Sequence, residues 1–556
     1  MIRRVLKIAV RAFWLLPGFL LWASFPPMGE KTDCLFALAP LLWLSRNADA
    51  RRNFRTWFAN GLLFWVATLS WMPAIVKNGG PWPLVVLGWF ALAAYCALYF
   101  GAFGWLSAKA WRWICREPEG DWQRPHRHPY LLRIVAIAVM EPLLWAGLEI
   151  ARSRLFGGFA WNQLGVAPVN GGFGAPAALG GVYLVSALVI LVNGTIASVA
   201  ERMIAPIRAA RGCPQGAFAG VPRWLRSVET ALPLALVWAV HAAGEAAVRH
   251  PADADGVPFK VALVQRNFPC PFMRESRTEP PISAYRKLAP RFAALRPDLV
   301  VLSESALCEF GAIGGARAES FAYALMDMAS ASAVLAGGSR EEGGREYNSA
   351  VLYAGPTPQV YDKVHLVPFG EYIPGDKLIP ALQALAPVGS CTPGEPKLLE
   401  LATEGGEKVP FGVAICFEDT DSALARRFAA DGARMLAFIT NDSWFYGSVE
   451  TVQHAWQAVA RAVETGLPVV RVGNSGVTGE ISPDGCATWL ADGREPVVDR
   501  PGAMLASVRF VGPGRGPTPY VRFGDKPILI AFLLFIGGMI LVQYKEHHEK
   551  NRYLSM

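Results

Sequence analysis

Long apolar runs separated by short polar joins dominate the chain before residue 250 and return after residue 526. There are eight of these runs, at Ala12–Met28, Cys34–Ser45, Trp57–Val76, Trp82–Ala108, Ile134–Ile150, Ala178–Ala200, Ala231–Ala243 and Pro527–Val542. A bilayer core takes about 20 helical residues, so the shorter runs need flanking residues to cross it. The pattern predicts a membrane α-helical bundle of about eight transmembrane helices, seven within residues 1–250 and the last at residues 526–544.

A different pattern occupies residues 256–515, where short strand-like runs alternate with helix-like stretches. Strands are predicted at Phe259–Gln265, Leu299–Ser303, Ala333–Gly337, Ser349–Tyr353, Phe411–Ile415, Met435–Thr440, Val469–Val472, Gly479–Ser482 and Met504–Val508. Helices are predicted at Ile282–Leu295, Glu319–Ala331, Asp421–Asp431 and Thr451–Gly466. Because the strands are rich in Val, Ile and Leu without clean alternation, they suit a buried sheet. We therefore expect one large α/β domain between the last two membrane helices.

Charge predicts the orientation of this arrangement. The net charge is +8, and the basic residues gather in five groups beside the apolar runs. These groups are Arg3, Arg4, Lys7 and Arg11; Arg46, Arg51, Arg52 and Arg55; Lys109, Arg112, Arg116, Arg124, Arg127 and Arg133; Arg202, Arg208, Arg211, Arg223 and Arg226; and Lys545, Lys550 and Arg552. Cytoplasmic loops are enriched in Lys and Arg. Eight crossings, or six, put every group in the cytoplasm and the α/β domain outside it.

Composition narrows the class of protein. A hydrophobic share of 53%, a mean hydropathy of +0.27 and 19 Trp exclude an ordinary soluble enzyme. The α/β domain has no basic stripe with interleaved aromatic residues, so nucleic acid is not a predicted partner. The sequence has no C-x-x-C pair, histidine cluster or glycine-rich phosphate loop, so neither a metal nor a cofactor is predicted. Disulfide pairing of Cys270, Cys308, Cys391 and Cys486 stays open, because spacing does not determine it.

Cys416 is the principal candidate for chemistry. It ends the apolar strand of Phe411-Gly-Val-Ala-Ile-Cys-Phe-Glu-Asp419 and precedes a helix-like stretch. Enzymes with α/β folds place nucleophiles at such a position. Taken alone, the residue is more often a core cysteine, because a free Cys packs as a small hydrophobe.

Two more polar residues, Glu304 and Lys363, also follow apolar strands. A carboxylate whose pKa is raised by burial can accept the proton of a thiol. A lysine, or the backbone N–H of Phe417, can stabilise the oxyanion of a tetrahedral intermediate. With Cys416 they form a complete set for acyl transfer without histidine. Each also has a plainer interpretation, Lys363 as a surface lysine and Glu304 as a helix-capping acid.

The segments around these three residues resemble, in their order, the carbon–nitrogen hydrolase (nitrilase) superfamily. Two later segments support the resemblance, Thr440-Asn-Asp-Ser-Trp-Phe445 and Gln453-His454. Further segments narrow it to the apolipoprotein N-acyltransferase family: Leu155-Phe-Gly-Gly-Phe-Ala-Trp-Asn-Gln-Leu-Gly165, Gly180-Gly-Val-Tyr-Leu-Val-Ser186, Val261-Ala-Leu-Val-Gln265, His365-Leu-Val-Pro-Phe-Gly-Glu-Tyr-Ile-Pro374 and Tyr520-Val-Arg-Phe-Gly-Asp525.

This resemblance implies a nitrilase-type αββα sandwich on the periplasmic side of a multi-pass protein of the bacterial inner (cytoplasmic) membrane. It implies transfer of a fatty acyl chain from a phospholipid to the α-amine of a diacylglyceryl apolipoprotein, the last step of lipoprotein maturation. Cys416 is then the nucleophile, Glu304 the general base and Lys363 the oxyanion stabiliser. Glu371 and Glu418 match acids of the family as supporting pocket residues, for which a salt bridge to Lys363 is a compatible structural role.

The sequence departs from the family pattern beside the candidate site. Leu302-Ser303 stand where Trp-Pro is usual, Phe417 where Tyr is usual and Arg266 where Gly is common, and Arg274 lies near the position of an expected aromatic residue. None of these departures removes a catalytic group, so they bear on substrate preference and on the lipid pocket.

Three other functions stay open. A membrane-bound nitrilase-like amidase or hydrolase would share the chemistry as far as the thioester. Such an enzyme would need only one helix as a membrane anchor, and the eight apolar runs argue against this alternative. A non-catalytic relative would bind lipoproteins or lipids without turnover. A transporter would need ionisable residues within the membrane, for which Glu141 and Glu149 are the candidates, the latter as a structural pair with Arg152.

Overall fold

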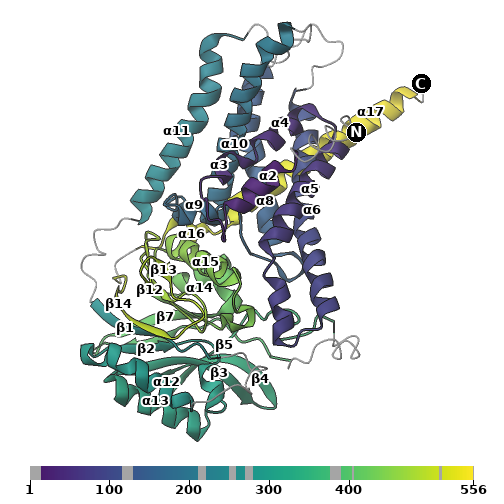
Figure 1. Cartoon of the computed structure of the whole chain (residues 1–556). Coiled ribbons are helices and arrows are strands. Elements are labelled where there is room, and N and C mark those ends of the chain that lie inside the picture. Colours follow the sequence, from purple (N-terminus) through teal and green to yellow (C-terminus); the bar gives the residue numbers. More distant parts are fainter. Residues whose placement is uncertain are drawn as a thin grey trace. The chain divides into compact units, whose positions relative to one another are not determined.

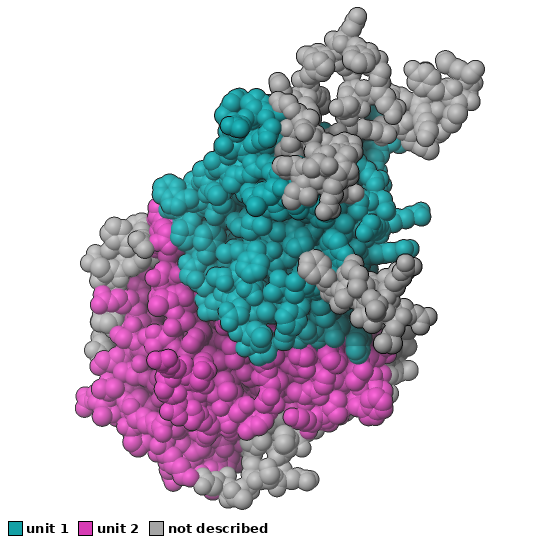
Figure 2. All heavy atoms as spheres, turned by 45° about the horizontal axis from the view of Figure 1, so that its top comes forward, with its two compact units in different colours: residues 1–69, 90–243, 523–556 teal, residues 70–89, 244–522 magenta. Residues whose placement is uncertain are grey.

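The computed structural model describes residues 14–115, 129–210, 221–248, 258–268, 280–375, 390–403, 406–512 and 516–554. Its two compact units are unit 1, residues 1–69, 90–243 and 523–556, and unit 2, residues 70–89 and 244–522 (Figure 2). Some residues of the sequence argument lie outside the described ranges, namely Arg3, Arg4, Lys7, Arg11, Arg116, Arg124, Arg127, Arg211, Cys270 and Arg274.

The apolar parts of the chain form helices (Figure 1). They are α2 (Leu16–Ala23), α3 (Cys34–Ala37), α4 (Ala39–Asn47), α5 (Ala50–Thr68), α6 (Trp82–Cys115), α7 (Pro129–Val135), α8 (Glu141–Arg152), α9 (Val166–Asn170), α10 (Ala177–Ala210), α11 (Arg223–Val248), α16 (Pro519–Phe523) and α17 (Lys526–Leu554). A π-helical turn, Ala136–Met140, joins α7 to α8 ahead of Pro142. Proline has no amide N–H to continue the regular ladder.

Within the described ranges, six helices are long and apolar enough to cross a membrane. They are Ala50–Asn78, Trp82–Ile114, Tyr130–Arg152, Ala177–Ala205, Arg223–Val248 and Lys526–Lys545. The first two predicted runs form only the short helices α2, α3 and α4. Pro17 and Pro40 lie in the first turns of α2 and α4, where proline starts a helix. The chain is a multi-pass membrane protein with six long apolar helices, and the remaining two of the eight crossings stay a prediction.

Buried polar side chains tie the helices of unit 1 together. The guanidinium of Arg46 on α4 donates to the Glu141 carboxylate of α8 at 2.9 Å and to the Gly194 carbonyl of α10 at 3.0 Å. Asn193 on α10 accepts the Leu38 N–H at 2.8 Å. Buried charges are tolerated when they are paired and hydrogen-bonded. Glu141, one of the transporter candidates, therefore has a structural role between helices.

Unit 2 is built on two sheets of six strands each among its described residues. The first has the order β14-β1-β2-β3-β4-β5, with β1 (Pro258–Gln265), β2 (Leu299–Leu302), β3 (Ala333–Glu342), β4 (Arg345–Tyr353), β5 (Gln359–Asp362) and β14 (Gly502–Arg509). The second has the order β11-β10-β9-β8-β7-β6, with β6 (Leu399–Ala402), β7 (Lys408–Ile415), β8 (Leu436–Thr440), β9 (Val469–Gly473), β10 (Gly479–Ile481) and β11 (Ala487–Trp489). A two-residue pair, β12 (Ala491–Asp492) and β13 (Glu495–Pro496), stands apart.

Helices cover each of the two large sheets (Figure 1). On the first sheet α12 (Pro281–Leu288) and α13 (Ala316–Ala329) contribute Tyr285 and Phe321 to a buried core with Val300 of β2. On the second lie α14 (Ser422–Ala430) and α15 (Glu450–Thr465). Phe428 of α14 packs so closely on Gly412 of β7 that a Cβ there would come within 2.6 Å of its ring. The predicted αββα sandwich is the observed architecture.

All nine predicted strands are present, and the four predicted helices coincide with α12 to α15. The first of them ends earlier than predicted, at Leu288, because Pro290 cannot continue the amide ladder and short 3-10 turns follow. The strands that were not predicted are β5, β6, β11, β12 and β13, none longer than four residues. Strands this short carry too few positions to show a period of two.

Candidate active site

The ends of four strands meet in a polar centre within unit 2. Strands β2 and β5 run in the same direction, because β2 is parallel to β3 and β4 is antiparallel to both β3 and β5. Glu304 and Lys363 therefore leave the first sheet at the same edge. Cys416 and Asn441 follow the parallel strands β7 and β8 of the second sheet. A hydrogen bond from the Asn441 N–H to the Glu304 carboxylate, 2.8 Å long, joins the two edges.

Cys416 has a backbone conformation that non-glycine residues rarely adopt. Its φ is +55°, at the first residue of the 3-10 turn η11 (Cys416–Thr420). Such strain costs about 1–3 kcal/mol and concentrates at functional sites. Burial raises the pKa of the Cys416 thiol well above its usual value, and the Glu304 carboxylate adds to the rise while Lys363 opposes it. The thiol therefore keeps its proton at rest and needs a base to become a nucleophile.

Glu304 is a buried carboxylate close enough to Cys416 to affect the pKa of its thiol. It is 6% exposed, and its carboxylate accepts the Asn348 side-chain amide at 2.7 Å and the Asn441 N–H at 2.8 Å. Burial raises the pKa of Glu304, and the nearby Lys363 ammonium opposes the rise. A raised pKa makes a carboxylate a better proton acceptor. The helix-capping interpretation of Glu304 is wrong, since its oxygens face an asparagine side chain and a turn of the other sheet.

Lys363 is a buried lysine, 1% exposed, so the surface interpretation is also wrong. Its Nζ lies 2.9 Å from Glu371 Oε1 and 3.9 Å from Glu304 Oε1. Burial alone would lower the pKa of Lys363, but Glu371, Cys416 and Glu304 outweigh it and raise the pKa above its usual value. A permanent positive charge thus lies beside the thiol, as oxyanion stabilisation requires.

Glu371 makes the predicted salt bridge to Lys363 and is held on its other side by the Val367 N–H at 2.8 Å. Burial alone would raise the pKa of Glu371, but Lys363 outweighs it and the pKa is lowered. The Asn348 amide donates to Glu371 at 2.6 Å as well as to Glu304. Asn348 was not predicted, because it lies within a strand rather than at a strand end.

Glu418 lies behind the centre and holds two backbone segments together. Its carboxylate accepts the N–H groups of Val364 at 2.7 Å, His365 at 3.0 Å and Ile415 at 2.8 Å. The Tyr361 hydroxyl donates to both of its oxygens at 3.0 Å. Burial raises the pKa of Glu418, and these N–H donors oppose the rise. The segment that carries Lys363 is thereby fixed to the strand that carries the cysteine.

A second buried cluster surrounds His454 on α15. Its ring nitrogens lie 3.0 Å from Asp419 Oδ1 and 3.0 Å from Asp442 Oδ1. Asp442, Glu450 and His454 offer ligand-type atoms within 4.8 Å of one another. The Arg471 guanidinium, however, lies 3.4 Å from both aspartates and supplies the positive charge that a metal would bring. We interpret the cluster as a compensated network of ion pairs.

The departures from the family pattern have local explanations. Arg266 forms an ion pair with the buried Glu309, and its guanidinium lies 5.6 Å from the ring centre of Tyr285. Leu302 and Ser303 are buried at the end of β2, where they complete the core. Glu304, Lys363 and Cys416 are all present beside these departures.

Comparison with known proteins gives the family. The model "Apolipoprotein N-acyltransferase N-terminal domain" matches residues 17–195, and the model "Carbon-nitrogen hydrolase" matches residues 260–495. The apolipoprotein N-acyltransferase of Geobacter metallireducens is 31% identical over 524 residues, which cover 92% of this chain and 91% of the relative. This chain belongs to the apolipoprotein N-acyltransferase family. The relative of the same name from Chromobacterium violaceum is 30% identical and covers 96% of the chain and 89% of that protein.

Among solved structures, an amidase of the nitrilase superfamily from Nesterenkonia is similar to part of this chain. It is 17% identical, with a TM-score of 0.34, and the match covers 46% of this chain and 92% of the amidase. The carbon–nitrogen hydrolase match agrees with the paired sheets of unit 2. The apolipoprotein N-acyltransferase family resemblance of the sequence is confirmed.

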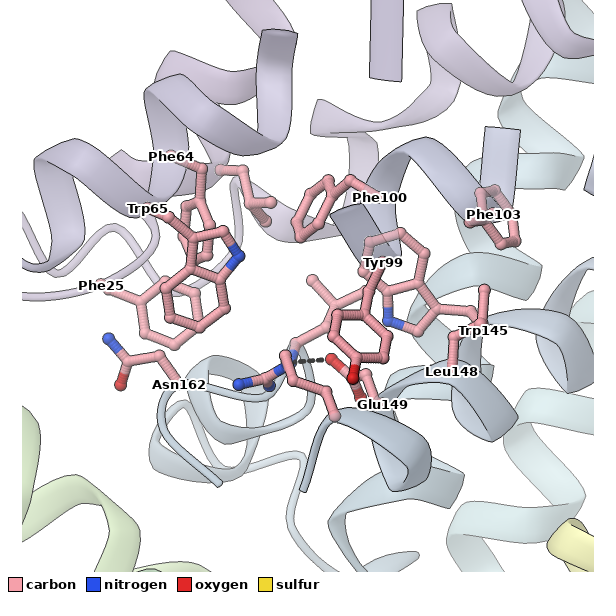
Figure 3. Close-up of a pocket in the computed structure, with 13 residues that line it drawn as sticks. Phe25, Phe64, Trp65, Tyr99, Phe100, Phe103, Trp145, Leu148, Glu149 and Asn162 are labelled. Atoms are coloured by element: carbon pink, nitrogen blue, oxygen red, sulfur yellow. Dashed lines mark hydrogen bonds between the residues drawn. The ribbon is translucent and has the colours of Figure 1, made fainter. Parts of the chain in front are cut away.

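A small cavity lies inside unit 1, among aromatic side chains of α5, α6 and α8 (Figure 3). Glu149 accepts the Leu164 N–H at 2.8 Å, and Arg152 donates to the carbonyls of Phe159 at 2.6 Å and Trp161 at 3.0 Å. The open space between the side chains is about 20 Å³, room for about one water molecule rather than an acyl chain. Glu149 and Arg152 therefore hold backbone in place, which gives no support to a transport pathway.

Proposed function

We propose that this chain transfers a fatty acyl chain from a membrane phospholipid to the α-amine of the N-terminal diacylglyceryl-cysteine of apolipoproteins. One observation carries the proposal. The buried Glu304, whose pKa is raised, and the buried Lys363, whose pKa is also raised, lie close enough to the half-buried Cys416 to affect the pKa of its thiol. A thiol nucleophile, a proton acceptor and a cation are the groups used for acyl transfer through a thioester.

In the first step Glu304 accepts the Cys416 proton, and the thiolate sulfur attacks the ester carbonyl carbon of the phospholipid. Lys363 and the Phe417 N–H stabilise the oxyanion of the tetrahedral intermediate. When the intermediate collapses, the carbon–oxygen bond breaks and Glu304 returns its proton to the departing lysophospholipid oxygen. The acyl chain is then bound to Cys416 as a thioester.

In the second step the lipoprotein amine attacks the thioester carbonyl while Glu304 accepts a proton from the nitrogen. Collapse breaks the carbon–sulfur bond, the thiolate recovers the proton, and the amide product leaves. Glu371 and Glu418 support both steps, the first by holding Lys363 and the second by fixing the turn of Cys416. Membrane lipid around the acyl chain would limit water, which favours the amine over hydrolysis.

We also propose the domain division and its orientation. Residues 1–250 supply seven transmembrane helices with their loops, residues 256–515 the catalytic domain and residues 526–544 the last helix. The catalytic domain lies on the periplasmic side of the bacterial inner membrane. The loop between α5 and α6 supports this, because alternation places it outside the cytoplasm and its Asn78 contacts the Trp444 carbonyl of unit 2 at 2.6 Å.

The test uses the full-length protein with a phospholipid that carries a radiolabelled acyl chain. The wild type is expected to form a labelled, hydroxylamine-sensitive acyl-enzyme and to release N-acylated peptide when a diacylated lipopeptide is added. Cys416→Ala should form no labelled enzyme, because the nucleophile is gone. The matched control, Cys486→Ala, removes an exposed thiol of the same unit and should behave like the wild type.

Labelled Cys416→Ala enzyme would contradict the role of Cys416. Release of free fatty acid in place of N-acylated peptide would instead favour the membrane-bound hydrolase. Absence of turnover by the folded wild type, in both assays, would favour a non-catalytic binding protein.

A further inference from the structure

His454 connects the nucleophile to its base through two turns of unit 2. On one side its Nε2 lies 3.0 Å from Asp419 Oδ1 and 3.3 Å from the Cys416 carbonyl oxygen. A carboxylate and a carbonyl oxygen both only accept hydrogen bonds. Nε2 therefore carries a hydrogen and donates it into η11, the turn that begins with the cysteine.

On the other side, Nδ1 of His454 lies 3.0 Å from Asp442 Oδ1 and 3.4 Å from Glu450 Oε1. Asp442 belongs to the turn after β8, and its neighbour Asn441 donates its N–H to Glu304. The Asp442 carboxylate also accepts the Thr440 hydroxyl at 2.8 Å. One imidazole ring thus reaches the turn of the nucleophile with one nitrogen and the turn that orients the base with the other.

The surroundings keep the ring positively charged. His454, Asp419 and Asp442 are each 1% exposed, so water does not compete for their hydrogen bonds. Burial alone would lower the pKa of His454, but Asp419 and Asp442 outweigh it and raise the pKa well above its usual value, against the opposing charge of Arg471. Burial alone would raise the pKa of Asp442, but Arg471 and His454 lower it to about 2. A doubly protonated imidazole can donate from both nitrogens at once.

Packing around Asp442 leaves this arrangement little freedom. A Cβ built on Gly476 would lie 1.7 Å from Asp442 Oδ2, so only glycine fits beside the carboxylate. A buried network of ion pairs and hydrogen bonds holds its members in one geometry. The distance between the two turns is therefore set by the imidazole ring between them.

We propose that His454 is a positioning residue for acyl transfer, which holds the turn of Cys416 in register with the turn of Asn441 and Asp442 that orients Glu304, by donating to both. It does not touch the substrate. The inference rests on the proposed roles of Cys416 and Glu304, and it adds to them the group that aligns thiol and base. Misplacement of reacting groups by about 1 Å can cost about 100-fold in rate.

The test compares His454→Gln with Thr465→Val in the full-length protein. A glutamine amide can donate to one turn but cannot bridge both. Thr465→Val is the matched control, because Thr465 is a buried polar residue at the C-terminal end of the same helix α15. Its hydroxyl donates to the Arg461 carbonyl at 2.7 Å and accepts the Leu467 N–H at 3.3 Å. For each variant the acyl-enzyme formation rate, kcat, the KM for phospholipid and Tm are measured.

For His454→Gln we expect the acylation rate and kcat to fall about 10-fold or more, with KM changed less than about twofold, because alignment and not binding is lost. Thr465→Val should lower Tm while keeping the acylation rate within about twofold of the wild type. A wild-type acylation rate in His454→Gln, or an equal slowing in both variants, would overturn the proposal.

If His454→Gln does not fold, Asp442→Asn decides. This variant keeps an oxygen acceptor for Nδ1 but removes the charge, so the link to one turn weakens. A kcat lowered about threefold or more at unchanged KM supports the proposal, and a wild-type kcat overturns it. If the wild type itself forms no acyl-enzyme on Cys416, the proposed function fails. If the wild type forms it and His454→Gln forms it at the same rate, this inference fails and the proposed function stands.

Discussion

At the scale of single residues, three glutamates of one site differ through their neighbours. Glu371 lies 2.9 Å from Lys363, which lowers its pKa and keeps it charged. Glu304 lies farther from the same ammonium, and burial raises its pKa. Carboxylates whose environments push their pKa values apart take different roles. Glu371 is thus suited to holding the Lys363 ammonium, and Glu304 is suited to exchanging a proton.

Glu418→Gln tests the third of these acids. The amide would present an N–H group to donors such as the Ile415 N–H and the Tyr361 hydroxyl, which the carboxylate now accepts. We expect kcat to fall about 10-fold or more and the free energy of unfolding to fall by about 1–3 kcal/mol, because buried donors lose their acceptor. Steady-state kinetics and urea unfolding measure the two effects.

The control is Glu400→Gln, which removes an exposed carboxylate of the same unit. It should stay within about 0.5 kcal/mol of the wild type in stability and keep its kcat. A Glu418→Gln enzyme with unchanged kcat would show that the contacts of Glu418 do not affect the position of Lys363 or Cys416.

At the scale of elements, the site depends on a loop between two apolar helices. The 3-10 helix η1 (Met72–Asn78) lies between α5 and α6, yet it belongs to unit 2. Asn78 donates to the Trp444 carbonyl at 2.6 Å, and the rings of Trp71 and Phe445 pack edge to face with centres 4.8 Å apart. The turn held in this way is the one whose Asn441 N–H orients Glu304.

Asn78→Ala is therefore expected to affect catalysis from outside the sandwich. Loss of the bond to Trp444 should cost about 1 kcal/mol of stability and lower kcat a few-fold, roughly threefold, through the orientation of Glu304. The neighbouring Lys77→Ala, which alters an exposed side chain of the same loop, should change neither. If Asn78→Ala and Lys77→Ala give the same kcat, the loop has no part in orienting the base.

At the scale of the whole molecule, the even number of long apolar helices among the described residues leads to a prediction of orientation. Six spans, the last at Lys526–Lys545, return the chain to the side from which α5 starts. If all six cross the membrane, the basic groups near Arg46 and Lys545 share one side, and the loop of Asn78 and the sheets of unit 2 share the other. We predict that the first side is the cytoplasm, because cytoplasmic loops are enriched in Lys and Arg.

Labelling of intact spheroplasts with a membrane-impermeant maleimide tests this orientation. Cys486 is a free, exposed thiol of unit 2 and should react before lysis, with the modified peptide identified by mass spectrometry. A cysteine introduced by Arg51→Cys, at an exposed position of α5, should react only after permeabilisation. Cys486→Ser is the control for the first signal. The reverse order of labelling would put the catalytic domain in the cytoplasm.

The sequence by itself determined the features that depend on neighbouring positions. Runs of apolar residues predicted the long membrane helices, and apolar strands ending at Glu304 and Cys416 predicted the site. These signals are local, because the length of an apolar run and the end of a strand are properties of consecutive residues. Lys363 was predicted in the same way from the strand before it, and the family motifs added Glu371 and Glu418.

The tertiary structure alone decided how distant segments meet. Asn348 bridges Glu304 and Glu371, Asn78 contacts Trp444, and His454 joins two turns that lie far apart in the chain. Short edge strands such as β5, which ends beside Lys363, take their place from pairing with β4 rather than from their own pattern. Register and topology bring these residues together, and a one-dimensional pattern carries no record of either.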